Sequence, residues 1–402
     1  MTIGTPNYEP VRTARELSAG RRSQGIDVLR GLAVVLVVLH HIHLRFLINH
    51  YNVADLLPQW LGKVLFFSGY YSVISFFVIS GFLITSLSLN RWGSLDRIPL
   101  LHFYRLRAAR ILPCLLLLLA VLSALHLAGA SDFVIKPERA SLSRALTAAL
   151  TLHLNWLEGH RGYLPGNWDV LWSLSVEETF YVLFPLLCLA MRRESGLLIC
   201  MAALIVIGPL NRMALMGQEP WEDYAYFSCM DGIAFGCIAA WITARVQLSR
   251  SMMRAAMILG VAAVMLIVAF RRQTFGLGLT AVGLNVTILE IGIALVLMAL
   301  AHGVGNSTLS RGTALLQLAG RGSYEIYLVH MFVVLGLMHP FKSLFGATSP
   351  NSAVYALTYG AMLAISVLLG YAVQRWFSEP FNKALRANRK KLPHATECSD
   401  YR

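Results

Sequence analysis

Residues 27–43 have the sequence DVLRGLAVVLVVLHHIH, in which an arginine and a group of histidines flank a long apolar run. Arg30 and His41 are eleven residues apart. In an α-helix their side chains return to within about 20° of the same face and lie roughly 16 Å apart along the axis. Ionisable side chains inside a membrane-spanning helix are costly and mark functional sites. The alternative is that Arg30 extends to one membrane interface and the histidines lie at the other.

The composition is that of a membrane protein. The chain has 402 residues, of which 56% are hydrophobic and 14% charged, whereas soluble domains have about 25% charged residues. The net charge of +13 suggests a nucleic-acid partner at first sight. However, the arginines and lysines cluster in short loops between apolar runs, as they do in membrane proteins. We therefore expect a polytopic protein in contact with membrane lipid, and no nucleic-acid partner.

Ten apolar runs are long enough to cross a membrane as helices, which predicts an all-α fold. Basic loops are expected on the cytoplasmic side, and this rule places both termini in the cytoplasm. The chain then divides into an N-terminal tail (1–26), a transmembrane domain (27–380) and a basic C-terminal tail (381–402). The expected spans cover residues 28–48, 64–89, 111–128, 174–191, 197–216, 229–245, 254–270, 280–301, 322–340 and 353–377.

Residues 146–157 are mostly apolar but are not expected to cross the membrane. A run of about 12 residues is too short for a span. The preceding span starts on the basic side and so ends outside, while the following span finishes at Arg192-Arg193, which is expected inside. This segment is therefore predicted to form one short re-entrant or interfacial helix.

Several common site motifs are missing from the sequence. No group of His, Cys, Asp or Glu has metal-ligand spacing, and none of the six cysteines belongs to a CxxC pair. GxSxG, P-loop and GxGxxG motifs are also absent, which leaves a hydrolase, an NTPase or a Rossmann fold without support. We predict no metal site and no permanently bound cofactor.

Three arginines lie close together before the third span. Arg105, Arg107 and Arg110 stand at the cytoplasmic end of a helix, where forked guanidinium contacts can bind several phosphates. Only Arg107 and Arg110 share one helical face. The alternative is an ordinary basic anchor at the membrane surface.

Two carboxylates lie at the outer start of a later span, in the sequence WSLSVEETFY (172–181). Ser173 or Ser175 can cap this helix, and an acid near a helix N-terminus suits the helix dipole, which explains Glu177. Glu178 lies deeper, where it can orient a histidine or accept a hydrogen bond from a substrate hydroxyl.

A polar stripe follows in the sequence SYEIYLVH (323–330). Ser323, Tyr327 and His330 recur at spacings of four and three, so they share one face of a helix. Such a stripe faces the bundle interior or a cavity, or else forms hydrogen bonds between helices. A histidine with three arginines and no serine nucleophile favours direct transfer between two bound substrates.

The order of these elements resembles the acyltransferase-3 family, bacterial membrane-bound O-acyltransferases that modify surface polysaccharides, lipopolysaccharide and some secondary metabolites. The matching elements are Arg30 with His41, FFVISGFLI (76–84), the basic segment 103–113, WSLSVEETFY (172–181) and SYEIYLVH (323–330). Two positions depart from the family pattern. Thr179 stands where a glutamine is usual, and Cys229 stands where an arginine often precedes the Asp231-Gly232 pair.

The resemblance implies roles for the residues in these elements. The donor would be acyl-CoA, most often acetyl-CoA, arriving from the cytoplasm, with its phosphates held by Arg105, Arg107 and Arg110. His41 would deprotonate the acceptor hydroxyl, and Arg30 and Glu178 would orient or charge it. The residues expected to bind substrate are Ser80, Ser323, Tyr327 and His330.

The resemblance further implies a stand-alone O-acyltransferase of the bacterial inner membrane, without a C-terminal soluble domain. Its expected acceptor is a cell-envelope glycan or a lipid-linked sugar. A small-molecule acceptor such as a macrolide sugar is an alternative, and so is a glycan or lipid transporter without transferase activity. Rings that can stack on a sugar, or form an interfacial belt, are expected at the outer face: Trp156, Tyr163, Trp168, Trp172, Trp221, Tyr224 and Tyr226.

Overall fold

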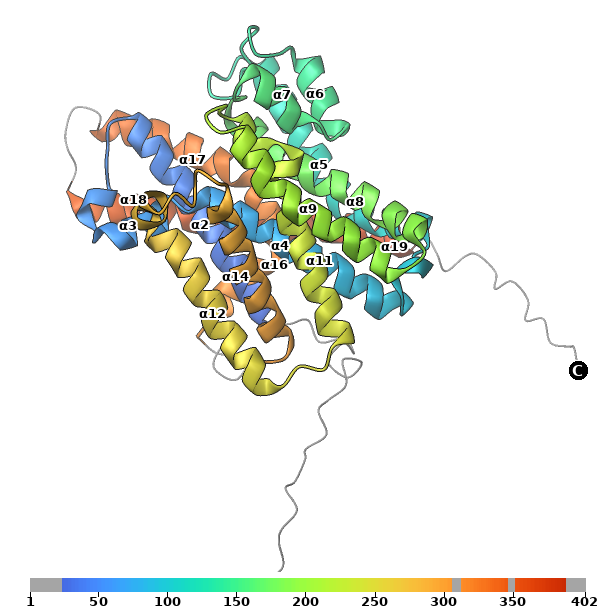
Figure 1. The fold of residues 1–402 in the computed structure, drawn as a ribbon. Helices are drawn as coiled ribbons and strands as arrows, with labels where there is room; N and C mark the ends of the chain where they lie inside the picture. Colours follow the sequence, from blue (N-terminus) through green and yellow to red (C-terminus); the bar gives the residue numbers. More distant parts are fainter. Residues whose placement is uncertain (1–23, 306–311, 346–350, 388–402) are drawn as a thin grey trace, which may run out of the picture.

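The computed structural model describes residues 24–305, 312–345 and 351–387, and this part of the chain forms helices and no strand (Figure 1). Ten stretches of it are long and apolar enough to cross a membrane, which confirms the predicted all-α, multi-pass fold. Their long helices are α2 (Gln24–Ile48), α4 (Gly69–Trp92), α5 (Leu100–Leu127), α8 (Leu171–Met191), α9 (Glu194–Ala214), α11 (Tyr226–Arg245), α12 (Arg250–Ala269), α14 (Leu284–Ala301), α17 (Ser323–Phe345) and α18 (Ser352–Val373).

Glycines bring the central helices into close contact. α4 packs most extensively on α11, while α2 lies against α4, α17 and the short helix α16 (Ala314–Arg321). A Cβ atom added to Gly81 would lie 1.9 Å from the Ile233 carbonyl oxygen, and one added to Gly236 would lie 2.0 Å from the Val78 carbonyl oxygen. Small residues permit such backbone approach between membrane helices. Ser80, next to Gly81, is therefore held inside the bundle.

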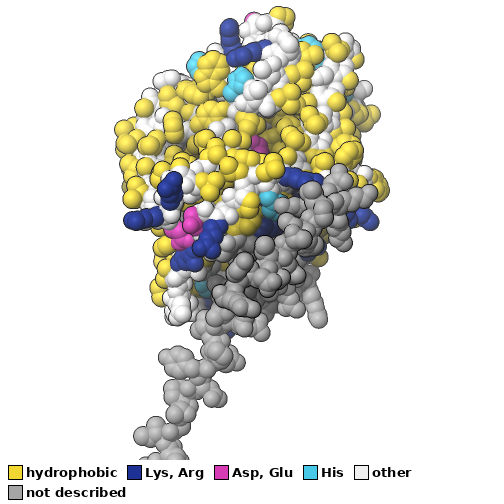
Figure 2. All heavy atoms as spheres, turned by 90° about the vertical axis from the view of Figure 1, so that its right-hand side faces the viewer, with side chains coloured by type: hydrophobic (Ala, Val, Ile, Leu, Met, Phe, Trp, Pro, Cys, Tyr) yellow, Lys and Arg dark blue, Asp and Glu magenta, His cyan; other side chains and the backbone are white. Residues whose placement is uncertain are grey.

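Apolar side chains cover much of the outside of the bundle. Leu101 is 83% exposed and Trp376 is 78% exposed. Figure 2 shows one face, on which hydrophobic side chains predominate and lysine and arginine side chains lie in small groups near its borders. An apolar surface of this extent is unfavourable in water and favourable in lipid.

The third long helix begins earlier than the sequence indicated. α5 starts at Leu100, and Pro113, which was expected at the start of the span, lies inside the helix. Proline breaks helices in water, but in a membrane bundle neighbouring groups can satisfy the freed backbone. The carbonyl that Pro113 frees is that of Ala109. Nearby, the Tyr324 hydroxyl donates a hydrogen bond to the Ile111 carbonyl, with an O–O distance of 3.0 Å, and this joins α17 to α5 beside the proline. The three arginines therefore belong to the first turns of α5.

The segment predicted as one short helix at 146–157 forms two, α6 (Leu142–Leu150) and α7 (Leu154–Arg161), which lie together at one end of the molecule (Figure 1). Leu152 between them has a φ of 61°. Its carbonyl accepts hydrogen bonds from the hydroxyls of Tyr226 and Thr179. Tyr226 and Thr179 belong to other helices, so the bend at Leu152 depends on tertiary contacts and could not be predicted from the local sequence. Neither helix is among the ten candidate spans.

The C-terminal boundary predicted at residue 380 falls within a helix, α19 (Glu379–Ala387). A π-helical turn, Gln374–Ser378, joins it to α18. The Arg105 guanidinium on α5 donates to the Leu385 carbonyl through Nε at 3.2 Å and Nη2 at 2.9 Å. This contact fixes α19 beside the basic start of α5.

A pH-dependent stability is expected from Glu158 on α7. Its side chain is fully buried, with Oε1 accepting from the Leu164 amide at 2.9 Å, and Oε2 has no hydrogen-bond partner among the described residues. Burial raises the pKa of Glu158 well above its usual value. A carboxyl whose pKa is raised in the folded state destabilises the fold increasingly as pH rises above its unfolded pKa of about 4.3.

Glu158→Gln mimics the protonated form. We therefore expect it to raise the thermal unfolding midpoint by on the order of a degree or more at pH 7.5, and by less at pH 4.5. Tryptophan fluorescence during heating measures both midpoints. An equal change at the two pH values would contradict the proton-dependent explanation.

Candidate functional site

A pair of histidines joins α2 to α17. The distance between His330 Nε2 and His41 Nδ1 is 3.3 Å, and the ring centroids are 4.9 Å apart. His41 Nδ1 also lies 2.9 Å from the Val37 carbonyl oxygen, and His330 Nδ1 lies 2.7 Å from the Tyr327 carbonyl oxygen. Because a carbonyl only accepts, the proton of each neutral ring is on Nδ1. His41 Nε2 is thereby left with a lone pair that can accept a proton.

The two predicted polar faces meet each other. On α2, Arg30 Nη2 donates to the Ser323 hydroxyl at 2.8 Å, and His41 contacts His330 three turns further along. Arg30 and His41 thus both face α17, and their partners on that helix, Ser323 and His330, both face α2. Ser323 and His330 each have a protein partner across the helix contact.

Tyr327 joins α17 to the start of α8. Its hydroxyl lies 2.8 Å from the Ser173 hydroxyl and donates to the Val170 carbonyl at 3.0 Å. α8 begins at Leu171 with no side-chain cap. Ser173 therefore lies inside the first turn and, contrary to expectation, does not cap the helix. All three residues of the predicted stripe on α17 make contacts between helices.

Glu177 accepts hydrogen bonds from two hydroxyls, those of Ser80 on α4 and Tyr181 on α8. The Arg107 guanidinium lies over the Tyr181 ring, 3.8 Å from its centroid. A continuous series of contacts therefore leads from Ser80 through Glu177 and Tyr181 to Arg107. The sequence had assigned Glu177 to the helix dipole alone, because its partner on α4 is far away in the chain.

Glu178 lies with the arginines and not with His41. Arg107 and Arg110 are both within range of electrostatic interaction with its carboxyl group. The hydrogen-bond partners of His41 are Val37 and His330. Within the described residues, His330 therefore occupies the place beside His41 that the sequence analysis gave to Glu178.

The three predicted arginines do not act as one group. Arg105 is exposed and bound to the Leu385 carbonyl, whereas Arg107 and Arg110 are half-buried in the bundle. Arg386 on α19 lies within electrostatic range of Arg91 at the end of α4 and of Arg110. Sequence analysis missed Arg91 and Arg386 because α19 reaches α5 only through tertiary packing. The basic character of 381–402 was the available signal.

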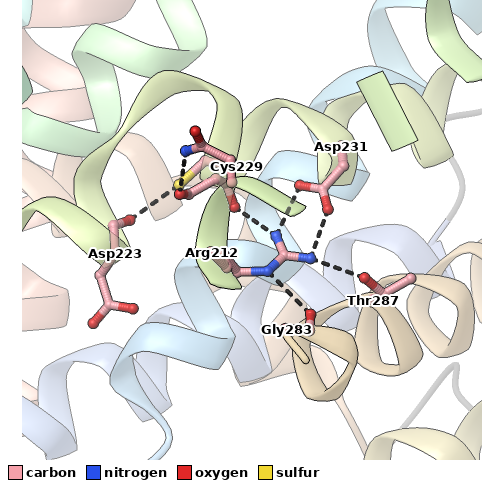
Figure 3. A network of polar contacts seen from close by, with 8 residues as sticks. Arg212, Asp223, Cys229, Asp231, Gly283 and Thr287 are labelled. Carbon is pink, nitrogen blue, oxygen red and sulfur yellow. Dashed lines mark hydrogen bonds and ion pairs between the residues drawn. The ribbon is translucent and has the colours of Figure 1, made fainter. Parts of the chain in front are cut away.

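A second polar network surrounds Arg212 on α9 (Figure 3). Its Nη2 forms an ion pair with Asp231 Oδ2 at 2.8 Å and donates to the Thr287 hydroxyl at 2.8 Å. Its Nη1 donates to the Ser228 carbonyl at 2.6 Å, and its Nε donates to the Gly283 carbonyl at 3.2 Å. The guanidinium thus connects α9, α11 and the start of α14.

This network bears on Cys229, which replaces the arginine often found before Asp231. In this chain Arg212 supplies a guanidinium to Asp231 from another helix, while the Cys229 thiol donates to the Asp223 carbonyl at 3.1 Å (Figure 3). Arg212 and Asp231 lie 19 residues apart on two different helices, so sequence analysis did not pair them.

The seven aromatic residues expected at the outer face fall into three groups, and one of these, Trp221 and Tyr226, is half-buried. Trp168, Trp172 and Tyr224 are buried, and the rings of Trp172 and Tyr224 stack at a centroid distance of 4.1 Å. These three belong to the core. Trp156 and Tyr163 are exposed, so these two of the seven rings are the most open to a ligand or to lipid headgroups.

A model of a family described as an acyltransferase domain matches residues 23–371. O-acetyltransferase OatA of Staphylococcus aureus (strain NCTC 8325 / PS 47) is 32% identical over 173 residues, covering 40% of this chain and 24% of that protein. Putative O-acetyltransferase SAS0844 of S. aureus (strain MSSA476) is 30% identical over 171 residues, covering 42% of this chain and 25% of that protein. The matched region is thus about a quarter of the length of these relatives. No solved structure matches the chain.

Proposed function

This chain belongs to the acyltransferase domain family, and we propose that it is an O-acyltransferase of the bacterial inner membrane with both termini in the cytoplasm. It moves an acetyl group from cytoplasmic acetyl-CoA to a hydroxyl of a cell-envelope glycan or lipid-linked sugar. Its similarity to O-acetyltransferase OatA and to putative O-acetyltransferase SAS0844 supports the reaction class. The proposed transferase domain covers 27–380 together with the rest of α19, which packs on α5.

The histidine pair is the observation that carries this proposal. His41 holds its Nδ1 proton toward the Val37 carbonyl and His330, so its Nε2 is free to act as a base. Nε2 takes the proton of the acceptor hydroxyl as that oxygen attacks the thioester carbonyl. The C–S bond breaks, and the leaving thiolate takes the proton from His41. The products are the ester and free CoA thiol, and His41 returns to its starting state.

The phosphates of CoA are assigned to Arg107 and Arg110, which lie in the same helix bundle as His41. Arg107 and Arg110 face Glu178, and Arg91 and Arg386 extend the positive charge toward α19. Like charges gathered in this way repel one another, and a polyanion such as CoA relieves that repulsion. Arg105 acts here through α19, because its guanidinium is already bound to the Leu385 carbonyl.

The remaining predicted residues connect the two ends. Arg30 is oriented by Ser323, His330 by the Tyr327 carbonyl, and Ser80 by Glu177. We propose that these groups position the thioester between the arginines and His41. Their role is orientation, which contributes to the rate by holding the two substrates in a reactive geometry.

The test is release of free thiol from acetyl-CoA by the purified protein, offered a mixed pool of cell-envelope glycans. We expect release that depends on the added glycan. A protein that neither binds CoA nor releases thiol would contradict the transferase proposal and favour a transporter.

The affinity for CoA is expected to depend on Arg107 more than on Arg105. Loss of a hydrogen bond to a charged group is worth about 1.5–3 kcal/mol, so Arg107→Ala is expected to weaken CoA binding by about tenfold or more. Arg105→Ala should change it less, since that side chain is committed to Leu385. Titration calorimetry with CoA measures both constants.

Arg254→Ala serves as the charge-matched control, because this exposed arginine lies at the start of α12. Equal weakening by all three substitutions would indicate general charge attraction and would contradict a specific phosphate site.

A further inference from the structure

Arg45 is a charged side chain of α2 that the proposed mechanism does not use. It follows His41 by four residues, which in a helix is about 40° from the same face and roughly 6 Å further along the axis. The two side chains are within electrostatic range of each other. Arg45 lies toward Ile48, the end of α2 that is proposed to face the outside.

The guanidinium of Arg45 makes no hydrogen bond with any residue in the described part of the chain. Its Nε is buried without a partner. The arginines Arg30 and Arg212, also inside the bundle, contrast with it, since each is bound to side chains of another helix. An arginine placed within a span without such a bond is costly, and this indicates a group held ready for a ligand.

Two carboxylates lie near Arg45 but form no ion pair with it in the described part of the chain. Asp132, in the loop after α5, and Asp169, just before α8, are both within its electrostatic range. Each is bound elsewhere. Asp132 Oδ2 lies 2.6 Å from His339 Nε2, and Asp169 Oδ1 accepts from the Tyr224 hydroxyl at 3.0 Å. One donor group and two acceptor groups thus converge from three elements.

Asp132 also lines a cavity of about 410 Å³ together with His339, whereas Arg45 and Asp169 are not among its lining residues. Phe133 and Phe332 also line it, with ring centroids 5.5 Å apart. Small-molecule pockets have volumes of about 300–1,000 Å³ and combine apolar walls with a few polar groups. The cavity has the size and the lining of such a pocket.

The charge of the site selects the class of ligand. Two carboxylates disfavour an anion and a guanidinium disfavours a cation. A neutral hydroxyl can accept from the guanidinium and donate to a carboxylate at the same time. Neighbouring hydroxyls on one ring can therefore bridge Arg45 to an aspartate, and a ring held at Asp132 lies at the edge of the cavity that the two phenylalanines line.

We propose that Arg45, Asp132 and Asp169 form a binding site for a neutral sugar ring of the acceptor, on the outer side of His41. This inference deepens the proposed function and rests on it for the identity of the ring as acceptor. Sugar binding itself can be measured without any acyl transfer.

The experiment is saturation-transfer-difference NMR on the full chain in lipid nanodiscs, which avoids detergents with sugar headgroups. The probes are methyl β-D-glucopyranoside and methyl β-D-glucuronide. We expect the wild type to bind the neutral glucoside in preference to the glucuronide, and Arg45→Ala to weaken that binding about tenfold. Arg45→Lys, which keeps the charge but not the fork, should weaken it less.

Arg272→Ala is the matched control, since Arg272 is an exposed arginine in the short helix α13 (Arg271–Gly276), which follows α12 on the predicted outer side. It is expected to leave glucoside binding unchanged. Equal binding by wild type and Arg45→Ala, preference for the glucuronide, or no binding of either probe would each overturn the proposal.

Thiol release and CoA binding, measured on the same preparations, separate this inference from the proposed function. A protein that binds the glucoside through Arg45 but handles no CoA has the sugar site and is not a transferase. A protein that releases thiol while Arg45→Ala keeps normal sugar binding is a transferase without this site.

Discussion

His41→Ala is expected to lower the rate of acyl transfer by about 10²–10⁴-fold, the usual contribution of a positioned general base. The bond from Nδ1 to the Val37 carbonyl leaves Nε2 as the basic atom. His41 is also the residue of α2 that contacts His330. CoA binding should be unchanged, because the arginines lie at the other end of the interior. Steady-state thiol release and CoA titration measure the two effects separately.

The neighbouring histidines provide the controls. His40 bonds through Nδ1 to the Phe66 carbonyl at 2.8 Å, on a different face of α2, so His40→Ala should keep the transfer rate per folded molecule. His330→Ala removes the ring beside His41 and should reduce the rate less than His41→Ala does. A fully active His41→Ala with an inactive His330→Ala would assign the base to His330 and refute the proposed roles.

Helical periodicity was sufficient to define the faces on which this site is built. A step of 100° per residue places Arg30 and His41 together on α2, and Ser323, Tyr327 and His330 together on α17. In the structure these two faces meet at Arg30–Ser323 and at His41–His330. Span number and fold class followed from apolar run length in the same way.

Helical periodicity did not predict the contacts between helices. Periodicity states which side of a helix a residue occupies but not which helix lies opposite, and this depends on close backbone contacts such as those at Gly81 and Gly236. The Ser80–Glu177 contact and the Arg212–Asp231 pair were therefore not predicted. Pro113 was misplaced for a related reason, since its helix continues only where neighbouring groups support it.

Arg212→Met is expected to reduce the free energy of unfolding by about 3–5 kcal/mol, because it removes the cation from a buried ion pair and leaves its partner charge uncompensated. Arg212 is 7% exposed and Asp231 0%. Glu290 on α14 is also fully buried and within electrostatic range of both. One guanidinium thus faces two carboxyl groups (Figure 3 shows the first). Thermal or SDS-induced unfolding in mixed micelles measures the change.

The double variant Arg212→Met with Asp231→Asn distinguishes charge from packing. Asparagine is the appropriate partner substitution, because a Cβ on Gly208 would lie only 2.0 Å from Asp231 Oδ2, so a bulkier side chain at 231 would clash with α9. If the stranded charge is the main cost, the double variant should be more stable than Arg212→Met alone, since both members of the pair are then neutral.

If the double variant loses the sum of the two single effects, the pair is uncoupled, and the four hydrogen bonds from Arg212 to Ser228, Asp231, Gly283 and Thr287 would act independently. The close approach of Gly208 and the complete burial of Asp231 favour coupling, because a charge that solvent does not reach depends on its ion-pair partner.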